Sequence, residues 1–94
     1  MRVHLELFGV SRLVAGVKEI ALELEDSATF RDVVRLLVTR YPGMIGDVVQ
    51  PDGESLQPPN IFNLNARRMI QADQMGDVLS DGDRIILMSM SAGG

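Results

Sequence analysis

Apolar and polar residues alternate in two segments near the start of the chain, residues 3–8 and 19–25. The apolar positions fall on every second residue, which is the pattern of a strand with one buried face. They are Val3, Leu5 and Leu7 in the first segment and Ile20, Leu22 and Leu24 in the second. The connection from Gly9 to Gly16 is short and bracketed by glycines, so we predict a loop there and a β-hairpin overall.

The spacing of apolar residues changes after residue 28 to the three-and-four pattern of an amphipathic helix. The apolar stripe consists of Phe30, Val33, Val34, Leu37, Val38 and Tyr41. Thr29 is a good N-cap, and Asp32 stands three residues later, where a capping box has an acid or an amide. Pro42 and Gly43 end the pattern, so we predict one helix between residues 30 and 41.

The second half of the chain has shorter signals. Residues 43–60 contain three prolines and three glycines, which predict a loop with a short extended piece at 44–49. A strand is predicted at 61–65, a turn at 65–67 and a short return strand at 69–70. The run Asp81-Gly82-Asp83 predicts a tight turn before the last strand, 84–90.

This order of elements predicts an α+β protein of the β-grasp (ubiquitin-like) type, with a mixed four- to five-stranded sheet. One main helix covers one face of the sheet, so the other face meets solvent or a partner. We expect residues 1–90 to form the domain and residues 91–94 to form a flexible C-terminal Gly-Gly tail.

Composition removes several classes of function. The chain of 94 residues has no cysteine, which excludes disulfides, thiolate catalysis, iron–sulfur ligation and cysteine-based zinc sites. Its net charge of −4 disfavours nucleic acid as a partner and favours a basic protein surface. No apolar run is long enough to span a membrane and no signal peptide is evident, so we expect a cytoplasmic protein without a membrane partner.

The polar side chains do not form a catalytic pattern. His4 is the sole histidine, and a surface position on the outer side of the first strand is its expected role. Asp77, Asp81 and Asp83 lie in a turn-rich segment and are expected to be solvated. No glycine-rich loop with a following Lys-Ser/Thr pair is present, and the methionines suit core or interface packing. We therefore expect neither a metal site nor a self-sufficient enzyme.

The chain ends in Ala92-Gly93-Gly94 after the apolar run of the last strand. Glycine lacks a Cβ, so such an end can pass through a narrow channel and present a terminal carboxylate. The alternative is a frayed end without a role. We interpret Gly94 as a chemical handle, with Gly93 and Ala92 keeping its approach narrow.

Several segments in this order resemble the MoaD/ThiS family of sulfur carriers. The hairpin connection has the family's aromatic, arginine and glycine at Phe8, Arg12 and Gly16. The other matching positions are Thr29, Leu37, Pro42, Leu64-Asn65, the run 79–85 with its Asp-Gly-Asp, and the Gly-Gly end. The resemblance covers nearly the whole chain and is nearest to the small subunit of molybdopterin synthase.

This resemblance implies that an E1-like enzyme uses ATP to adenylate Gly94, and that the adenylate becomes a thiocarboxylate. The thiocarboxylate then donates sulfur in molybdopterin or thiamine biosynthesis. The chain itself would bind no cofactor, and its partners would be the activating enzyme and the large subunit of a synthase or another sulfur acceptor. The family meets these partners through two apolar positions that match Phe8 and Met88.

Residue parity places Phe8 and Met88 on the open face of the sheet, unless they merely cover its edge. Arg67 and Arg68 are expected to rim this patch. One departure is the run 87–90, Leu-Met-Ser-Met, where many family members have an aromatic and two prolines. Two alternatives to a sulfur carrier remain at this point: a ubiquitin-like modifier joined to lysines through Gly94, and a β-grasp binding module whose end is never activated.

Overall fold

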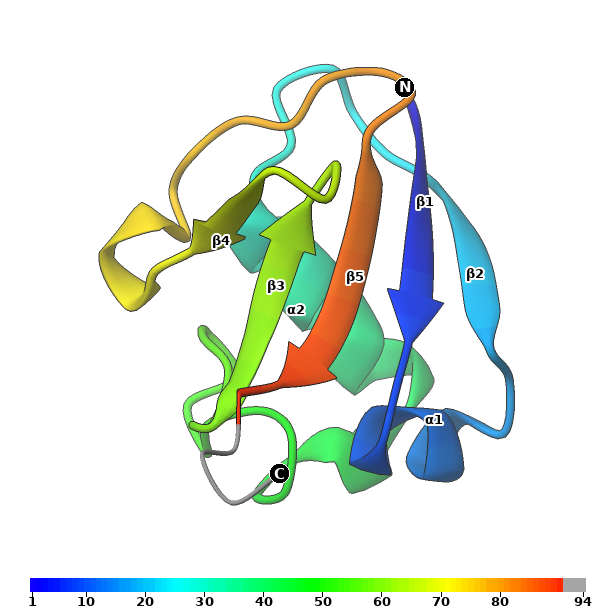
Figure 1. Cartoon of the computed structure of the whole chain (residues 1–94), viewed down its shortest axis with the longest axis vertical. Coiled ribbons are helices and arrows are strands. Elements are labelled where there is room, and N and C mark those ends of the chain that lie inside the picture. The colour runs from blue at the N-terminus through cyan, green and yellow to red at the C-terminus, as the bar shows by residue number, and fades with distance from the viewer. Residues whose placement is uncertain (91–94) are drawn as a thin grey trace.

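A computed structural model describes residues 1–90 of the chain. Five strands form one sheet in the order β2-β1-β5-β3-β4 (Figure 1). The strands are β1 (Arg2–Leu7), β2 (Glu19–Glu23), β3 (Asn60–Leu64), β4 (Arg68–Ile70) and β5 (Arg84–Ser89). The helices are α1 (Val10–Ala15) and α2 (Phe30–Arg40), with 3₁₀ turns η1 (Pro42–Met44) and η2 (Ala72–Gln74). The predicted strands and the main helix are thereby confirmed, with ends shifted by one or two residues.

Strand β5 occupies the centre of the sheet, although it comes last among the described strands. It pairs in parallel with β1 and antiparallel with β3, while the β1–β2 and β3–β4 pairs are antiparallel. The sheet is therefore mixed, and the first and last strands of the described chain lie side by side.

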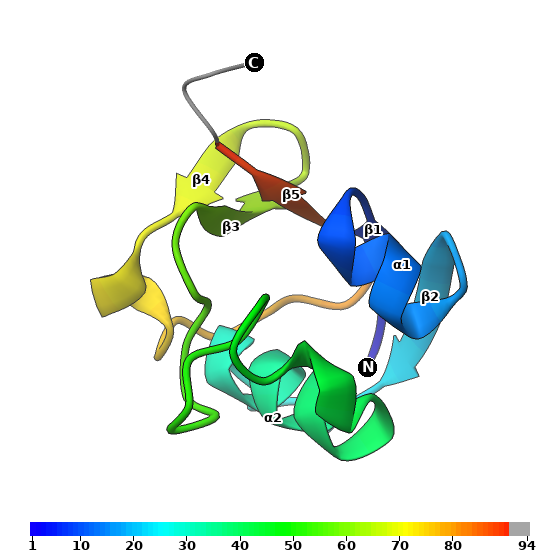
Figure 2. The ribbon, with the colours of Figure 1, turned by 90° about the horizontal axis from the view of Figure 1, so that it is seen from below.

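One face of the sheet and helix α2 enclose the hydrophobic core (Figure 2). Every second residue of β1 and β5 faces the helix and is almost fully buried, as the alternating pattern predicts. From α2, Phe30, Val33, Val34 and Leu37 are fully buried against them. The rings of Phe30 and Phe62 lie 5.9 Å apart between centroids, so an aromatic pair joins the helix to β3. Among residues 1–90, no helix covers the opposite face of the sheet (Figure 2).

The start of α2 has the capping box that the sequence predicts. The side chain of Thr29 accepts a hydrogen bond from the backbone N–H of Asp32, and the Asp32 carboxylate accepts one from the N–H of Thr29 (2.8 Å). Two N–H groups at the helix start are thereby satisfied.

The connection between β1 and β2 differs from the loop that we predicted, because residues 10–15 form helix α1. Gly9 precedes it with φ 62° and ψ −133°, a backbone conformation that favours glycine, and Gly16 ends it in the left-handed region. Ser11 is fully buried and its hydroxyl donates to the carbonyl of Phe8 (2.8 Å). A helix of six residues is too short for its apolar spacing to stand out from a loop.

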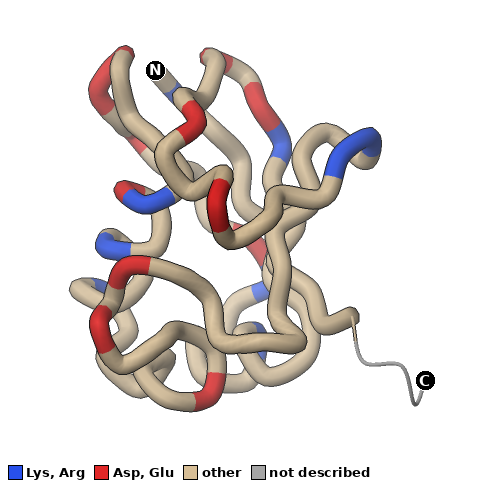
Figure 3. The backbone as a smooth tube through the Cα atoms, turned by 90° about the vertical axis from the view of Figure 1, so that its left-hand side faces the viewer, with Lys and Arg blue, Asp and Glu red and all other residues tan. Residues whose placement is uncertain are grey.

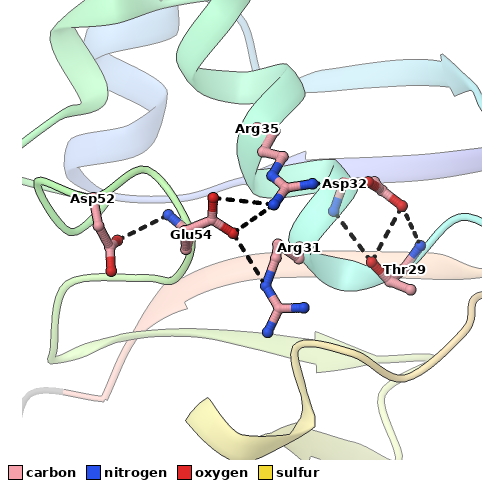
Figure 4. A network of polar contacts seen from close by, with 6 residues as sticks. All are labelled: Thr29, Arg31, Asp32, Arg35, Asp52 and Glu54. Carbon is pink, nitrogen blue, oxygen red and sulfur yellow. Dashed lines mark hydrogen bonds and ion pairs between the residues drawn. The ribbon is translucent and has the colours of Figure 1, made fainter.

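The extended piece predicted at 44–49 is also wrong. Residues 42–44 form the 3₁₀ turn η1, and residues beyond it make only isolated bridges. Figure 4 shows how the loop is attached to α2: the Glu54 carboxylate accepts from Arg35 (2.7 Å) and pairs with Arg31 (3.2 Å). Asp52 in turn accepts from the backbone N–H of Glu54 (2.9 Å). Ionic contacts and the buried Met44, Val48 and Val49 thus hold a loop that lacks regular structure.

None of the helices formed by residues 1–90 has the length and apolarity needed to cross a bilayer.

Replacing Thr29 with alanine removes half of the capping box. We expect Thr29→Ala to lower the free energy of unfolding by about 1 kcal/mol. This corresponds to a fall in Tm of about 4–8 °C in a domain of this size, measurable by thermal denaturation followed by circular dichroism.

Thr39→Ala is the matched control, because Thr39 is exposed near the other end of α2 and bonds only to the carbonyl of Arg35 in its own helix. Alanine is the better helix former at such a position, so Tm should stay level or rise slightly. Equal losses in the two variants would contradict the capping role of Thr29.

Candidate docking face on the open side of the sheet

Alternation along β5 separates two sets of apolar side chains. Ile85 and Leu87 are fully buried against α2, whereas Ile86 and Met88 are only half-buried on the open side. Phe8 follows the last residue of β1 and is 41% exposed. The structure therefore places Phe8 and Met88 on the open side, as residue parity predicts.

These side chains form a hollow. Phe8, Gly9, Ile86, Met88 and Ser89 line a shallow depression of about 430 Å³ where β1 and β5 end. We call it the apolar hollow. It adjoins the end of the last strand, and an exposed apolar concavity of this kind is typical of a protein–protein contact.

Helix α1 fixes the position of Phe8 at the rim of the apolar hollow. The backbone N–H of Phe8 donates to the carbonyl of Leu87 (3.0 Å), which extends the β1–β5 pairing by one residue. The guanidinium of Arg12 lies 4.8 Å from the centre of the Phe8 ring, and its Nε donates to the carbonyl of Leu7 (2.8 Å). A cation–π contact and two backbone hydrogen bonds thus orient the aromatic ring.

Sequence reasoning missed part of this site. It predicted a loop beginning at Gly9 and left Ile86 and Ser89 out of the docking set, although Ile86 has the same parity as Met88 along β5. Arg12 was noted only as part of a family pattern. Its contact with Phe8 depends on α1, which begins two residues after Phe8 and turns the chain so that the Arg12 guanidinium lies over the Phe8 ring.

The apolar surface continues across β3 to β4. Ile61 is opposite Met88, Asn63 is opposite Ile86, and Met69 is opposite Asn63 in the strand registers. All three are half-buried. The apolar half of the open face therefore spans three strands, β5, β3 and β4.

The other half of the open face, on β1 and β2, is ionic. His4 hydrogen bonds to Glu19 (2.8 Å), and Arg84 of β5 donates to Glu6 (2.8 Å). Arg2 donates to Glu23 (2.6 Å) in the same way. The hydrogen bond and the charge of His4 hold the pKa of the Glu19 carboxyl below its usual range. His4 is thus a surface histidine, and residues 1–90 contain no cluster of three metal-ligating side chains.

Arg68 is not brought together with Phe8 and Met88. It lies on the same side of β4 as the buried Ile70, and its guanidinium is 3.7 Å from the Asp77 carboxylate. The β3–β4 turn, residues 65–67, carries Arg67 and does project on the open side (Figure 3). The residue of β4 that does lie on the open face is Met69, whose sulfur accepts a hydrogen bond from the Asn63 amide (3.5 Å).

The predicted reactive end, Ala92, Gly93 and Gly94, lies outside the described residues. The last described residue is Met90, whose N–H donates to the carbonyl of Pro59 (2.8 Å).

Comparison with known proteins shows the family to which this chain belongs. No family model matches the chain. Small archaeal modifier protein 3 of Haloferax volcanii is 35% identical over 94 residues, and the match covers 100% of both chains. This chain belongs to the family of ubiquitin-like small modifiers and sulfur carriers.

Two further likenesses extend the family relationship. The molybdopterin synthase sulfur carrier subunit of Chlamydomonas reinhardtii is 28% identical over the full length of both chains. The crystal structure of SAMP1 from Haloferax volcanii superimposes with a TM-score of 0.80 at 24% identity, covering 100% of both chains. These likenesses confirm the resemblance to sulfur carriers of the MoaD type and the β-grasp fold. One relative is thus a small modifier protein and the other the sulfur carrier subunit of a synthase.

The His4–Glu19 contact in this family member yields a test by titration. Because the folded-state pKa of Glu19 is lowered, the contact stabilises the fold above the ordinary glutamate pKa. That contribution is lost as pH falls through the folded-state value. We expect His4→Leu to move the Glu19 titration midpoint upward, as measured by NMR of the side-chain carboxyl carbon. An unchanged midpoint would assign the low pKa to another cause.

Proposed function

We propose that this protein is a sulfur carrier whose Gly94 carboxylate is adenylated by an E1-like enzyme and converted to a thiocarboxylate. The thiocarboxylate donates sulfur in cofactor biosynthesis, with molybdopterin as the leading pathway. One observation carries the proposal: the apolar hollow is built on the same strand that leads to the chain end. Met88 lines the hollow and precedes Gly94 by six residues, a reach of about 20 Å when extended.

The proposed chemistry needs a terminal carboxylate and little else from this chain. The Gly94 carboxylate attacks the α-phosphate of ATP, and pyrophosphate leaves to give an acyl adenylate. A sulfide-level nucleophile then attacks the carbonyl carbon and AMP leaves, which produces the thiocarboxylate. The carboxylate is a poor electrophile before adenylation, so the activating enzyme supplies both ATP and the catalysis. Gly93 has no side chain and Ala92 has only a methyl group, which suits a narrow enzyme channel.

The apolar hollow is the proposed contact for both partners, the activating enzyme and the large subunit of a synthase. Its lining contains the exposed Phe8 and the half-buried Met88, next to the end of β5. Because both partners would bind the same surface, only one of them can hold the chain end at a time. Sulfur loading and sulfur donation would then be separate encounters.

A second candidate function is protein modification through an isopeptide bond between Gly94 and a lysine of a target. The observation in its favour is the 35% identity to small archaeal modifier protein 3. Both functions begin with the same adenylate and differ in the nucleophile that attacks it, sulfide or an amine.

Removal of Gly94 tests the chemistry of the chain end. We expect the Gly94-deleted protein to form no thiocarboxylate when incubated with ATP, the activating enzyme and a sulfur donor. Its Tm should stay within about 2 °C of the intact protein, because the core lies within residues 3–87. The measurement is intact mass before and after treatment with a thiol alkylator.

The absence of cysteine makes this readout specific, because a thiocarboxylate is then the one group on the C-terminal peptide that reacts readily with a thiol alkylator. The adduct also separates sulfur loading from methionine oxidation, which adds a similar mass to any of six methionines. A deletion variant that still transfers sulfur would refute the proposal. A lysine-linked conjugate without any thiocarboxylate would instead favour the modifier function.

Substitution of Met88 tests the docking face. We expect Met88→Lys to slow ATP–pyrophosphate exchange by the activating enzyme at least tenfold, because a charge replaces an apolar group in the hollow. Ala21→Lys is the matched control on the exposed β2 strand, opposite His4 in the ionic half, and should change the rate less than threefold. Equal effects of the two lysines would remove the hollow from the interface.

A further inference from the structure

Asn63 is a polar side chain at the centre of the apolar half of the open face. It lies between Ile86 on β5 and Met69 on β4, which are its two cross-strand neighbours. Among the described residues, its amide N–H donates only to the Met69 sulfur, at 3.5 Å. Its amide oxygen is buried and, within residues 1–90, is the one buried side-chain oxygen or nitrogen without a hydrogen-bond partner.

This arrangement costs folding energy. A buried amide that makes one weak hydrogen bond loses its interactions with water and gains little in return. Turning the amide by 180° does not help, because the NH₂ group would then take the buried position without an acceptor. A leucine of similar size would fill the same space without an unpaired polar atom. Such a local conflict with good folding is expected where a residue serves binding.

We propose that Asn63 is a specificity-determining residue of the docking face, and that its amide oxygen accepts a hydrogen bond from an N–H donor of the activating enzyme. This inference rests on the proposed function, because it takes the activating enzyme as the occupant of the face. The oxygen becomes reachable when the flexible side chain of Met69, the cross-strand neighbour of Asn63, shifts.

The surroundings of Asn63 favour a donor-rich, basic partner surface. Asn63 is directly opposite Ile86, so it is continuous with the apolar hollow. The neighbouring ionic half carries the carboxylates of Glu6, Glu19 and Glu23 against the guanidiniums of Arg2 and Arg84. The chain as a whole has a net charge of −4. An unpaired acceptor on the face of a chain with a net negative charge complements N–H donors on the enzyme and disfavours apolar or acidic surfaces at this point.

Two substitutions separate a binding role from a structural one. Asn63→Leu removes the acceptor and the buried polar group, so we expect Tm to rise by about 4 °C while Kd for the activating enzyme increases about tenfold. Asn63→Asp keeps an acceptor but buries a charge, so Tm should fall while Kd stays within about threefold. Both quantities are measured on the full chain, Tm by thermal denaturation and Kd by calorimetry with the purified activating enzyme.

Opposite changes in Tm and Kd for Asn63→Leu, with Kd retained in Asn63→Asp, would establish the role of Asn63. An Asn63→Leu protein that binds as well as the parent would overturn it, as would losses of stability and affinity in parallel. Met88→Lys distinguishes this failure from failure of the proposed function. If Met88→Lys abolishes binding and Asn63→Leu does not, only the role of Asn63 is wrong; if neither variant affects binding, the docking face itself is wrong.

Discussion

The parallel pairing of β1 with β5 is the constraint on which the rest of the structure depends. It joins the first and last described strands, and β3 completes the other edge of β5. Because side chains alternate along β5, the same pairing fixes two surfaces at once: Ile85 and Leu87 close the core, and Ile86 and Met88 form part of the hollow. A slip of one residue would exchange these two sets, so core stability and docking geometry share one register.

Strong local signals account for the parts of the fold that the sequence predicts. Three such signals are the alternation around Leu5, the apolar stripe of α2 and the Thr29–Asp32 cap. Each is formed by residues that are close together in the sequence. The failures are of a different kind. Helix α1 is too short to show periodicity, and the long loop takes its shape from Glu54 meeting arginines nineteen and more residues away in sequence. Such contacts exist only after the chain has folded, so no local pattern records them.

The candidate site was predictable to the extent that strand parity defines it. Parity identifies the side of the sheet on which Phe8 and Met88 lie, and the same rule places Ile86 on that side. It could not identify Asn63, whose unpaired oxygen becomes apparent only when the neighbours on two other strands are in register. Arg68 shows the same limit. Its contact with Asp77 depends on where the segment after β4, which includes η2, places Asp77, and strand parity does not record that. The alternation within each strand thus predicts which side chains lie on the open face, whereas the contacts among them depend on how the strands come together.

The central position of β5 also has a consequence for biosynthesis. A chain grows from its N-terminus, so the sheet cannot close until the ribosome has made the strand that ends at Ser89. Before that point, the β1–β2 and β3–β4 hairpins have no strand between them and each exposes an unpaired apolar edge. Incomplete chains of this protein are therefore poor candidates for independent folding and good targets for aggregation or proteolysis. The cell would accumulate either the finished domain or very little of it.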